Sequence, residues 1–174
     1  MSSKIEIERK FLVLQNDFIE QASVKHSIIQ GYLCATSSST VRIRLKDNTG
    51  FITIKGKSKD GGLSRYEWEK EIDQAEATQL LKLCQGNLII KDRYEVPLGN
   101  HIVEVDVFYG ENEGLILAEI ELKTNDEVFE KPAWLGKEVT GDRRFSNSNL
   151  ISYPFKYWKE EIITTDGKMD GEQM

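Results

Sequence analysis

The sequence predicts a mainly β (α+β) fold in which eight antiparallel strands are accompanied by a few short helices. The first observation is an alternation of charged and apolar residues with a period of two, which is typical of a half-buried strand. It begins at Glu6-Ile-Glu8-Arg-Lys10 and recurs along most of the chain. The second observation is that short turn sequences separate the alternating segments, and short connections favour antiparallel pairing.

The alternating segments and the turns between them define the individual elements. Strands are predicted at 4–13, 27–35, 41–47, 51–57, 63–72, 88–96, 101–109 and 115–123. Helices are predicted at 16–23, 74–85, 147–152 and 155–163, while 134–144 is predicted to be irregular. Asn16 and Asp73 are the expected N-caps of the first two helices, and Glu76 completes a capping-box pattern. The prediction is a single domain over 1–163, followed by a disordered tail at 164–174.

Composition narrows the class of protein. The chain has 174 residues, 39% hydrophobic and 30% charged, as expected for a globular domain rather than a disordered one. A net charge of −6 argues against a general nucleic-acid coat protein, although it does not exclude a local basic groove. Cys34 and Cys84 lack the spacing of metal ligands, and no apolar run has the length of a membrane span. We therefore expect a cytoplasmic protein with no nucleic-acid or membrane partner.

Strand after strand carries full charges on one face. The acidic residues of this face are Glu6, Glu8, Glu67, Glu69, Glu104, Asp106, Glu119 and Glu121, and the basic residues are Lys10, Arg42, Arg44, Lys55, Arg65, Lys91 and Arg93. For any single pair, the ordinary explanation is the solvated face of an antiparallel sheet. Solvated faces usually mix charges with Ser, Thr, Asn and Gln, however, and here the charges dominate on seven strands.

Two arrangements satisfy this pattern. The sheet can lay its apolar face on the helices and leave the charges in open water, or it can close on itself with the charges inside. The closed arrangement crowds like charges, which requires a cation among the carboxylates and an anion among the arginines. Oxygen ligands suit Mg²⁺ or Mn²⁺, and arginine suits phosphate oxygens. The number of basic residues fits a triphosphate better than a single phosphate, and no P-loop is present.

The ordered series resembles the CYTH family, also called triphosphate tunnel metalloenzymes, in its small bacterial form. The resemblance rests on Glu6-x-Glu8-x-Lys10 and the later Arg-x-Arg, Glu-x-Glu and Lys-x-Arg pairs, and it spans roughly 4–160. The segment Trp134-Leu-Gly-Lys-Glu-Val-Thr-Gly-Asp142-Arg-Arg-Phe-Ser-Asn147 is also similar, although Phe145 stands where many relatives have Tyr. The resemblance implies a closed eight-stranded antiparallel β-barrel that forms a charged tunnel, with helices packed outside.

The resemblance also implies roles for individual residues. Metal would be held by Glu6, Glu8, Glu119 and Glu121, with Glu67, Glu69 and Asp106 as further ligands or water-orienting groups. Phosphates would be bound by Lys10, Arg42, Arg44, Lys55, Arg65, Lys91 and Arg93, and the catalytic candidates are Lys10, Tyr32 and Glu69.

The implied function is Mg²⁺- or Mn²⁺-dependent hydrolysis of a triphosphate, most simply inorganic tripolyphosphate, bound inside the barrel. Adenylate cyclase and thiamine triphosphatase are the enzymatic alternatives, because the family resemblance extends to both. A polyphosphate- or nucleotide-binding module is the non-enzymatic alternative, but pure anion binding would not require so many carboxylates. The expected partner is a small-molecule triphosphate, and exposed apolar strand faces leave a homodimer open.

Overall fold

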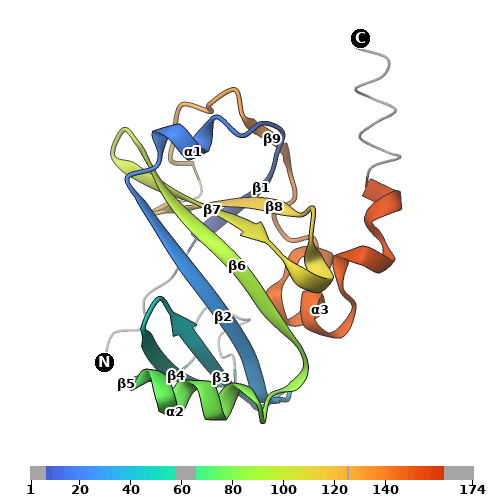
Figure 1. Cartoon of the computed structure of the whole chain (residues 1–174). Coiled ribbons are helices and arrows are strands. Elements are labelled where there is room, and N and C mark those ends of the chain that lie inside the picture. The colour runs from blue at the N-terminus through green and yellow to red at the C-terminus, as the bar shows by residue number, and fades with distance from the viewer. Residues whose placement is uncertain (1–6, 58–65, 125, 163–174) are drawn as a thin grey trace.

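The computed structural model describes residues 7–57, 66–124 and 126–162 (Figure 1). Within these ranges, nine strands form one antiparallel sheet in the order β5-β4-β3-β2-β6-β7-β8-β1-β9. The strands are β1 (Ile7–Val13), β2 (Val24–Ala35), β3 (Ser39–Lys46), β4 (Thr49–Gly56), β5 (Glu67–Ile72), β6 (Gln85–Leu98), β7 (His101–Phe108), β8 (Ile116–Leu122) and β9 (Leu135–Glu138). The helices are α1 (Phe18–Gln21), α2 (Gln74–Leu81) and α3 (Asn147–Ser152), with 3₁₀ turns η2 (Gly110–Asn112), η3 (Arg143–Phe145) and η4 (Phe155–Tyr157).

The predicted elements are largely present, with shifted ends. Each predicted strand corresponds to one of β1–β8, and Asp73 caps α2 by accepting a 2.7 Å hydrogen bond from the Glu76 backbone N–H. The N-cap of α1 is Asp17 rather than Asn16, and it makes no side-chain capping bond. The predicted helix at 155–163 is replaced by η4 and a helical turn at 159–162. The predicted tail, 164–174, lies outside the described residues. None of the described helices has the length and apolarity needed to cross a membrane.

The prediction of a closed eight-stranded barrel is wrong, because the described sheet is open with β5 and β9 at its two edges. The second edge of β1 is occupied by β9, where Phe11 pairs with Glu138 and Val13 with Leu135. The 134–144 segment, predicted to be irregular, supplies this ninth strand. Over Phe11–Val13, β9 therefore takes the position that a closing partner of β1 would need.

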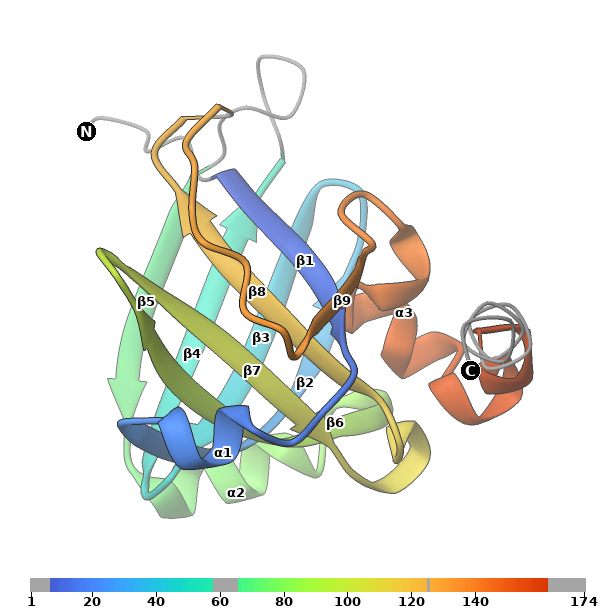
Figure 2. The ribbon, with the colours of Figure 1, turned by 90° about the horizontal axis from the view of Figure 1, so that it is seen from above.

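The open sheet is nevertheless strongly curved (Figures 1 and 2). The long strands β2 and β6 connect one half, made of β3, β4 and β5, to the other half, made of β7, β8 and β1. Helix α2 lies outside the first half and α1 outside the second, while β9 continues the second half of the sheet beyond β1. The space between the two halves is therefore bordered by the face of the sheet that α1 and α2 do not cover.

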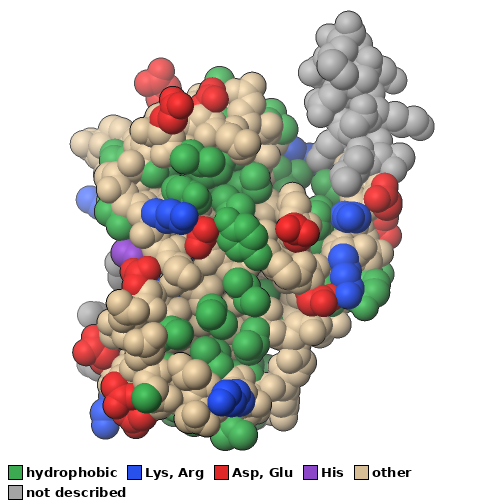
Figure 3. Space-filling model, in the orientation of Figure 1, with side chains coloured by type: hydrophobic (Ala, Val, Ile, Leu, Met, Phe, Trp, Pro, Cys, Tyr) green, Lys and Arg blue, Asp and Glu red, His purple; other side chains and the backbone are tan. Residues whose placement is uncertain are grey.

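The apolar clusters show which side chains occupy each face. On the outer face, Phe18 of α1 packs with Val105 and other strand residues, and Ala77 of α2 packs with Ile43. Figure 3 shows more hydrophobic side chains along the middle of this outer surface, with charges scattered around them. A third cluster lies at one end of the inner face, where the segment 139–158 packs on the sheet. Its members are Ile89, Phe108, Leu115, Leu117, Val139, Phe145, Leu150, Ile151, Phe155 and Trp158.

Helix α2 approaches β4 closely at Gly50. A Cβ added at Gly50 would lie 2.6 Å from the Ala77 Cβ and 2.9 Å from the Ile72 Cγ1. Gly50→Ala should therefore lower the free energy of unfolding by about 1–3 kcal/mol, because the packed helix must move. Urea denaturation measures the change. Gly56→Ala in the same strand is the control, since its Cβ would meet nothing closer than 3.6 Å. Equal stabilities for the two variants would contradict the close approach.

Candidate functional site

The strand registers place the predicted charged residues on one common face, because directly paired residues in a sheet point to the same side. Lys10 pairs with Glu119, which pairs with Glu104, and Asp106 pairs with Arg93. In the other half, Tyr32 pairs with Arg42, Arg42 with Thr53, and Thr53 with Glu69. The described members of the face are Glu8, Lys10, Tyr32, Arg42, Arg44, Lys55, Glu67, Glu69, Lys91, Arg93, Glu104, Asp106, Glu119 and Glu121. Glu6 and Arg65 lie outside the described residues.

This face is the inner one, since Ile89 and Phe108 share it with Lys91 and lie under the segment 139–158. Lys91, Arg93 and Asp106 of β6 and β7 are enclosed, whereas Glu104 of β7 and Glu69 of the edge strand β5 are open to solvent. The exposed fraction of the side chain is 1% for Lys91 but 46% for Glu69. The site is therefore a charged trough with a buried floor at β6 and β7.

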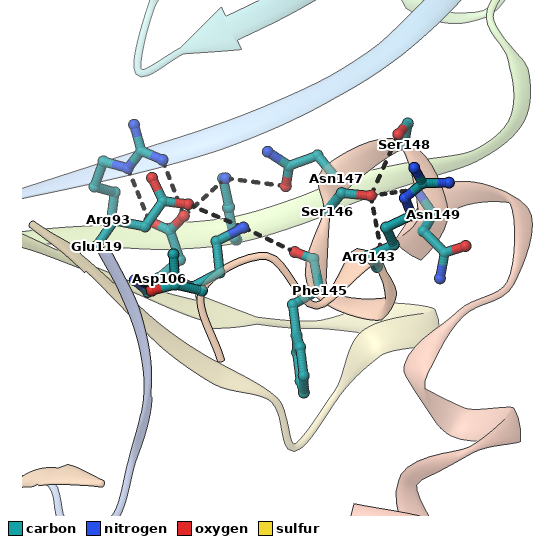
Figure 4. A network of polar contacts seen from close by, with 12 residues as sticks. Arg93, Asp106, Glu119, Arg143, Phe145, Ser146, Asn147, Ser148 and Asn149 are labelled. Atoms are coloured by element: carbon teal, nitrogen blue, oxygen red, sulfur yellow. Dashed lines mark hydrogen bonds and ion pairs between the residues drawn. The ribbon is translucent and has the colours of Figure 1, made fainter. Parts of the chain in front are cut away.

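A buried ionic triad forms that floor (Figure 4). The Lys91 Nζ lies 2.8 Å from Asp106, and the Arg93 guanidinium donates two hydrogen bonds of 2.8 and 2.9 Å to the same carboxylate. Arg93 also lies 3.3 Å from Glu104. Both oxygens of Asp106 are thus engaged by cations.

The triad shifts the protonation equilibria of its members. Burial opposes ionisation of Asp106, but the charges and hydrogen bonds of Lys91 and Arg93 outweigh it and hold the pKa of the carboxyl well below its usual range. Burial lowers the pKa of Lys91, and Asp106 offsets part of that effect. Burial also opposes the charge of Arg93, yet its bonds to Asp106 raise its pKa. The carboxylate therefore favours the charged forms of both enclosed bases, although burial still leaves the pKa of Lys91 below its usual value.

The segment after β9 fixes two lysines of the site. Lys10 Nζ lies 3.4 Å from Glu119 and donates a 3.2 Å hydrogen bond to the backbone carbonyl of Phe145. Lys91 Nζ donates a 3.5 Å hydrogen bond to the Asn147 side-chain oxygen. Figure 4 shows Phe145 and Asn147 beside the triad. Neither contact is predictable from the charge pattern, because a backbone carbonyl has no sequence signature and Asn147 lies outside the alternating strands.

The two arginines of β3 are held by neutral side chains, which the charge pattern did not predict as site residues. Arg44 Nε donates a 2.8 Å hydrogen bond to Gln30, and Arg42 donates a 3.3 Å bond to Thr53. Thr53 in turn donates a 2.7 Å bond to Glu69. Burial and the charges of Arg42 and Arg93 lower the pKa of Arg44 to about 10. The alternation could have identified Gln30, because it lies two residues before Tyr32 on the same face.

A cavity of about 160 Å³ opens beside Arg42. Its lining includes Tyr32, Arg42, Thr53, Lys55 and Ser148. The described lining contains two basic residues and no carboxylate, so its chemistry suits an anion. A larger cavity of about 540 Å³, lined in part by Arg143 and Asn149, shares Tyr32 and Ser148 with it.

Carboxylates gather on the other half of the face. Glu8 pairs with Glu121 across β1 and β8, and Glu104 pairs with Glu119 across β7 and β8. Directly opposed like charges are unfavourable, and a divalent cation with oxygen preference relieves the repulsion. The donor set therefore fits Mg²⁺ or Mn²⁺. No group of three or more acidic, histidine or cysteine side chains in the described part of the chain is arranged to bind a metal alone. Phosphate oxygens would have to complete the coordination, as is usual for Mg²⁺.

Asp106→Asn should lower the free energy of unfolding at pH 7 by about 3–5 kcal/mol, because Lys91 and Arg93 lose their buried counter-charge. The pKa of Asp106 is depressed in the folded protein, so its contribution is complete above the unfolded value of about 4 and is lost as the pH falls below it. Urea unfolding should therefore show that the difference in the free energy of unfolding between wild type and Asp106→Asn becomes smaller from pH 7 to pH 3. Asp92→Asn on the outer face, paired with the exposed Lys25, should cost much less. A difference in the free energy of unfolding that does not change with pH would contradict the role of Asp106 as a buried counter-charge.

Comparison with known proteins identifies the family. The CYTH domain family matches residues 4–146. A protein of Acetivibrio thermocellus named inorganic triphosphatase is 44% identical over 156 residues, which cover 89% of this chain and 98% of the relative. One of the same name from Nitrosomonas europaea is 38% identical over 154 residues, covering 86% and 99%. The crystal structure of an inorganic triphosphatase aligns over 87% of this chain and 95% of its own, with a TM-score of 0.67 and 33% identity. The chain belongs to the CYTH domain family, as the ordered series of charged pairs predicted.

Proposed function

We propose that this chain is a divalent-metal-dependent hydrolase of inorganic tripolyphosphate, which it binds on the inner charged face. The observation that carries the proposal is that one half of that face is rich in carboxylates (β1, β7 and β8) and the other is rich in bases (β3 and β4), with Lys10, Glu67 and Glu69 as exceptions. A polyanion bridging bound metal and arginine would neutralise both halves at once. Two relatives that are 44% and 38% identical are named inorganic triphosphatase, which supports the choice of substrate.

The basic residues bind the phosphate chain. This set comprises Lys10, Arg42, Arg44, Lys55, Lys91 and Arg93, with Arg65 as a further member outside the described residues. The anion-compatible cavity beside Arg42 and Lys55 supports the assignment. Asp106 acts as a positioning residue rather than a ligand, because both of its oxygens already accept bonds from Lys91 and Arg93.

The carboxylates hold Mg²⁺ or Mn²⁺. Glu8, Glu119 and Glu121, with Glu6 outside the described residues, form the main set, and Glu67 and Glu69 lie across the trough as additional ligands or water-orienting groups. When bound, the cation neutralises charge on the phosphates and polarises the phosphorus that is attacked. The opposed pairs Glu8–Glu121 and Glu104–Glu119 support its location in this half.

The chemical step is in-line transfer of the terminal phosphoryl group to water, which yields phosphate and pyrophosphate. Phosphoryl transfer requires little covalent chemistry from the protein, so positioning and charge stabilisation dominate. Lys10 is held by Glu119 and the Phe145 carbonyl, so its ammonium group is pre-positioned for a phosphate oxygen.

Glu69 is 46% exposed and anchored by Thr53, which leaves it accessible to a water molecule. Tyr32, opposite Arg42, contacts the substrate in the same cavity.

The proposed substrate is tested by measuring phosphate release from tripolyphosphate, ATP and thiamine triphosphate, each with Mg²⁺ and with Mn²⁺. We expect the highest kcat/KM for tripolyphosphate and loss of activity with a chelator, restored by adding the metal back. Formation of cyclic AMP from ATP without phosphate release would support a cyclase instead. Binding of tripolyphosphate without any turnover would support a polyphosphate- or nucleotide-binding module.

Lys10→Ala should reduce kcat/KM for tripolyphosphate by at least about 10²-fold, the size expected for loss of a positioned donor at developing charge. Glu119→Ala should also reduce it, because both the proposed metal site and the partner of Lys10 are lost. Steady-state phosphate release measures both. Lys70→Ala is the matched control, since Lys70 alternates with Glu69 and lies on the opposite face of β5. Unchanged rates for Lys10→Ala with an intact circular-dichroism spectrum would refute the assignment.

We further propose a cytoplasmic location, in keeping with the free thiols of Cys34 and Cys84. The homodimer stays a prediction.

A further inference from the structure

Gln30 is a fully buried amide on the charged face, with a hydrogen-bond donor that the protein does not use. Its side-chain oxygen accepts the 2.8 Å bond from Arg44 Nε, and its exposed fraction is 0%. An arginine nitrogen can only donate, so this bond fixes which end of the amide is oxygen and which is nitrogen. The remaining Nε2 group is buried and has no hydrogen-bond partner. Such a group is rare and calls for an acceptor.

The surroundings of Gln30 are rich in cations. By register it lies opposite Arg44 on β3 and Ile89 on β6. The charged positions directly opposite or one register step diagonal to it are all basic, namely Arg42, Arg44, Lys46 and Lys91. Arg42 Nε is also buried without a hydrogen-bond partner. Two buried donors therefore lack acceptors in the same part of the face, where basic side chains predominate and the Glu69 carboxylate lies 3.9 Å from Arg42.

This environment favours an anion with several oxygens. The lowered pKa of Arg44 shows that burial and the neighbouring Arg42 and Arg93 already disfavour further positive charge here. A neutral amide supplies hydrogen-bond donors without adding to that repulsion. Gln30 thus extends the donor set at a point where another lysine or arginine would be costly.

We propose that Gln30 Nε2 donates a hydrogen bond to a phosphate oxygen of the substrate, so that Gln30 is a substrate-binding residue. The identity of the ligand as a triphosphate rests on the function proposed above. The competing explanation is that Gln30 only supports Arg44 through its oxygen. The two roles use opposite ends of the amide, so they can be separated by substitution.

Gln30→Glu keeps the size of the side chain and the acceptor for Arg44, but it replaces the donor with a negatively charged oxygen. We expect the melting temperature to rise, because the new carboxylate lies among four cations. We expect the Kd for tripolyphosphate, measured by calorimetry on metal-free protein, to increase at least about 10-fold, as for loss of a hydrogen bond to a charged group. Repulsion between the new carboxylate and the phosphates adds to that increase, so the decisive outcome is the opposite one: unchanged or tighter binding would overturn the proposal.

Two further variants complete the test. Gln30→Met retains length but removes both polar ends, so the Kd should also increase, whatever happens to stability. Gln79→Glu makes the same charge change on the exposed side of α2 and should leave both Kd and melting temperature unchanged. Wild type that binds and hydrolyses tripolyphosphate, with Gln30→Glu and Gln30→Met binding equally well, would overturn only the role of Gln30. Wild type that binds tripolyphosphate without hydrolysing it would refute only the hydrolase, and absence of binding would refute both.

Discussion

The buried carboxylate of Asp106 is the constraint on which the charged face depends. Lys91 and Arg93 lie two residues apart on β6, and their side chains are almost completely enclosed. Two such cations would repel each other strongly in a low-dielectric interior without an anion between them. Asp106 supplies that anion from β7 and fixes the direction of the guanidinium, whose third nitrogen lies 3.3 Å from Glu104. The positive charges are thus in place before any ligand arrives. Groups that are already positioned can stabilise developing charge without reorganising during the reaction.

The sequence was sufficient for the shared face but not for the edges of the sheet. A period of two places residues such as Arg42 and Arg44 on one side wherever the strand lies, so alternation predicted both the strands and their common charged face. Closure is decided elsewhere, by which segment pairs with the second edge of β1. That segment is the four-residue β9, which contains Gly136 and makes only two register pairs with β1. So short a pattern cannot be distinguished from a loop by periodicity.

The site residues that the sequence did not predict were overlooked for one reason. Gln30 and Thr53 are uncharged, and Phe145 contributes its backbone, so none of them belongs to a pattern of charges. The substitution of Phe for the expected Tyr at 145 is explained by the same geometry. The ring is buried against Trp158, with centroids 5.3 Å apart, while the carbonyl reaches Lys10. The contact with Lys10 therefore does not need a hydroxyl group.

The bond between Lys10 and Phe145 joins residues 135 positions apart, and within the described ranges β1 pairs with β8 and β9 alone. During synthesis, more than a hundred residues after the start of β1 must be added before either strand that pairs with it exists. Such long-range closure is entropically costly and slows folding. A growing chain on the ribosome consequently holds its N-terminal glutamates and lysine without their partners. The charged face is therefore complete only after translation has passed Phe145.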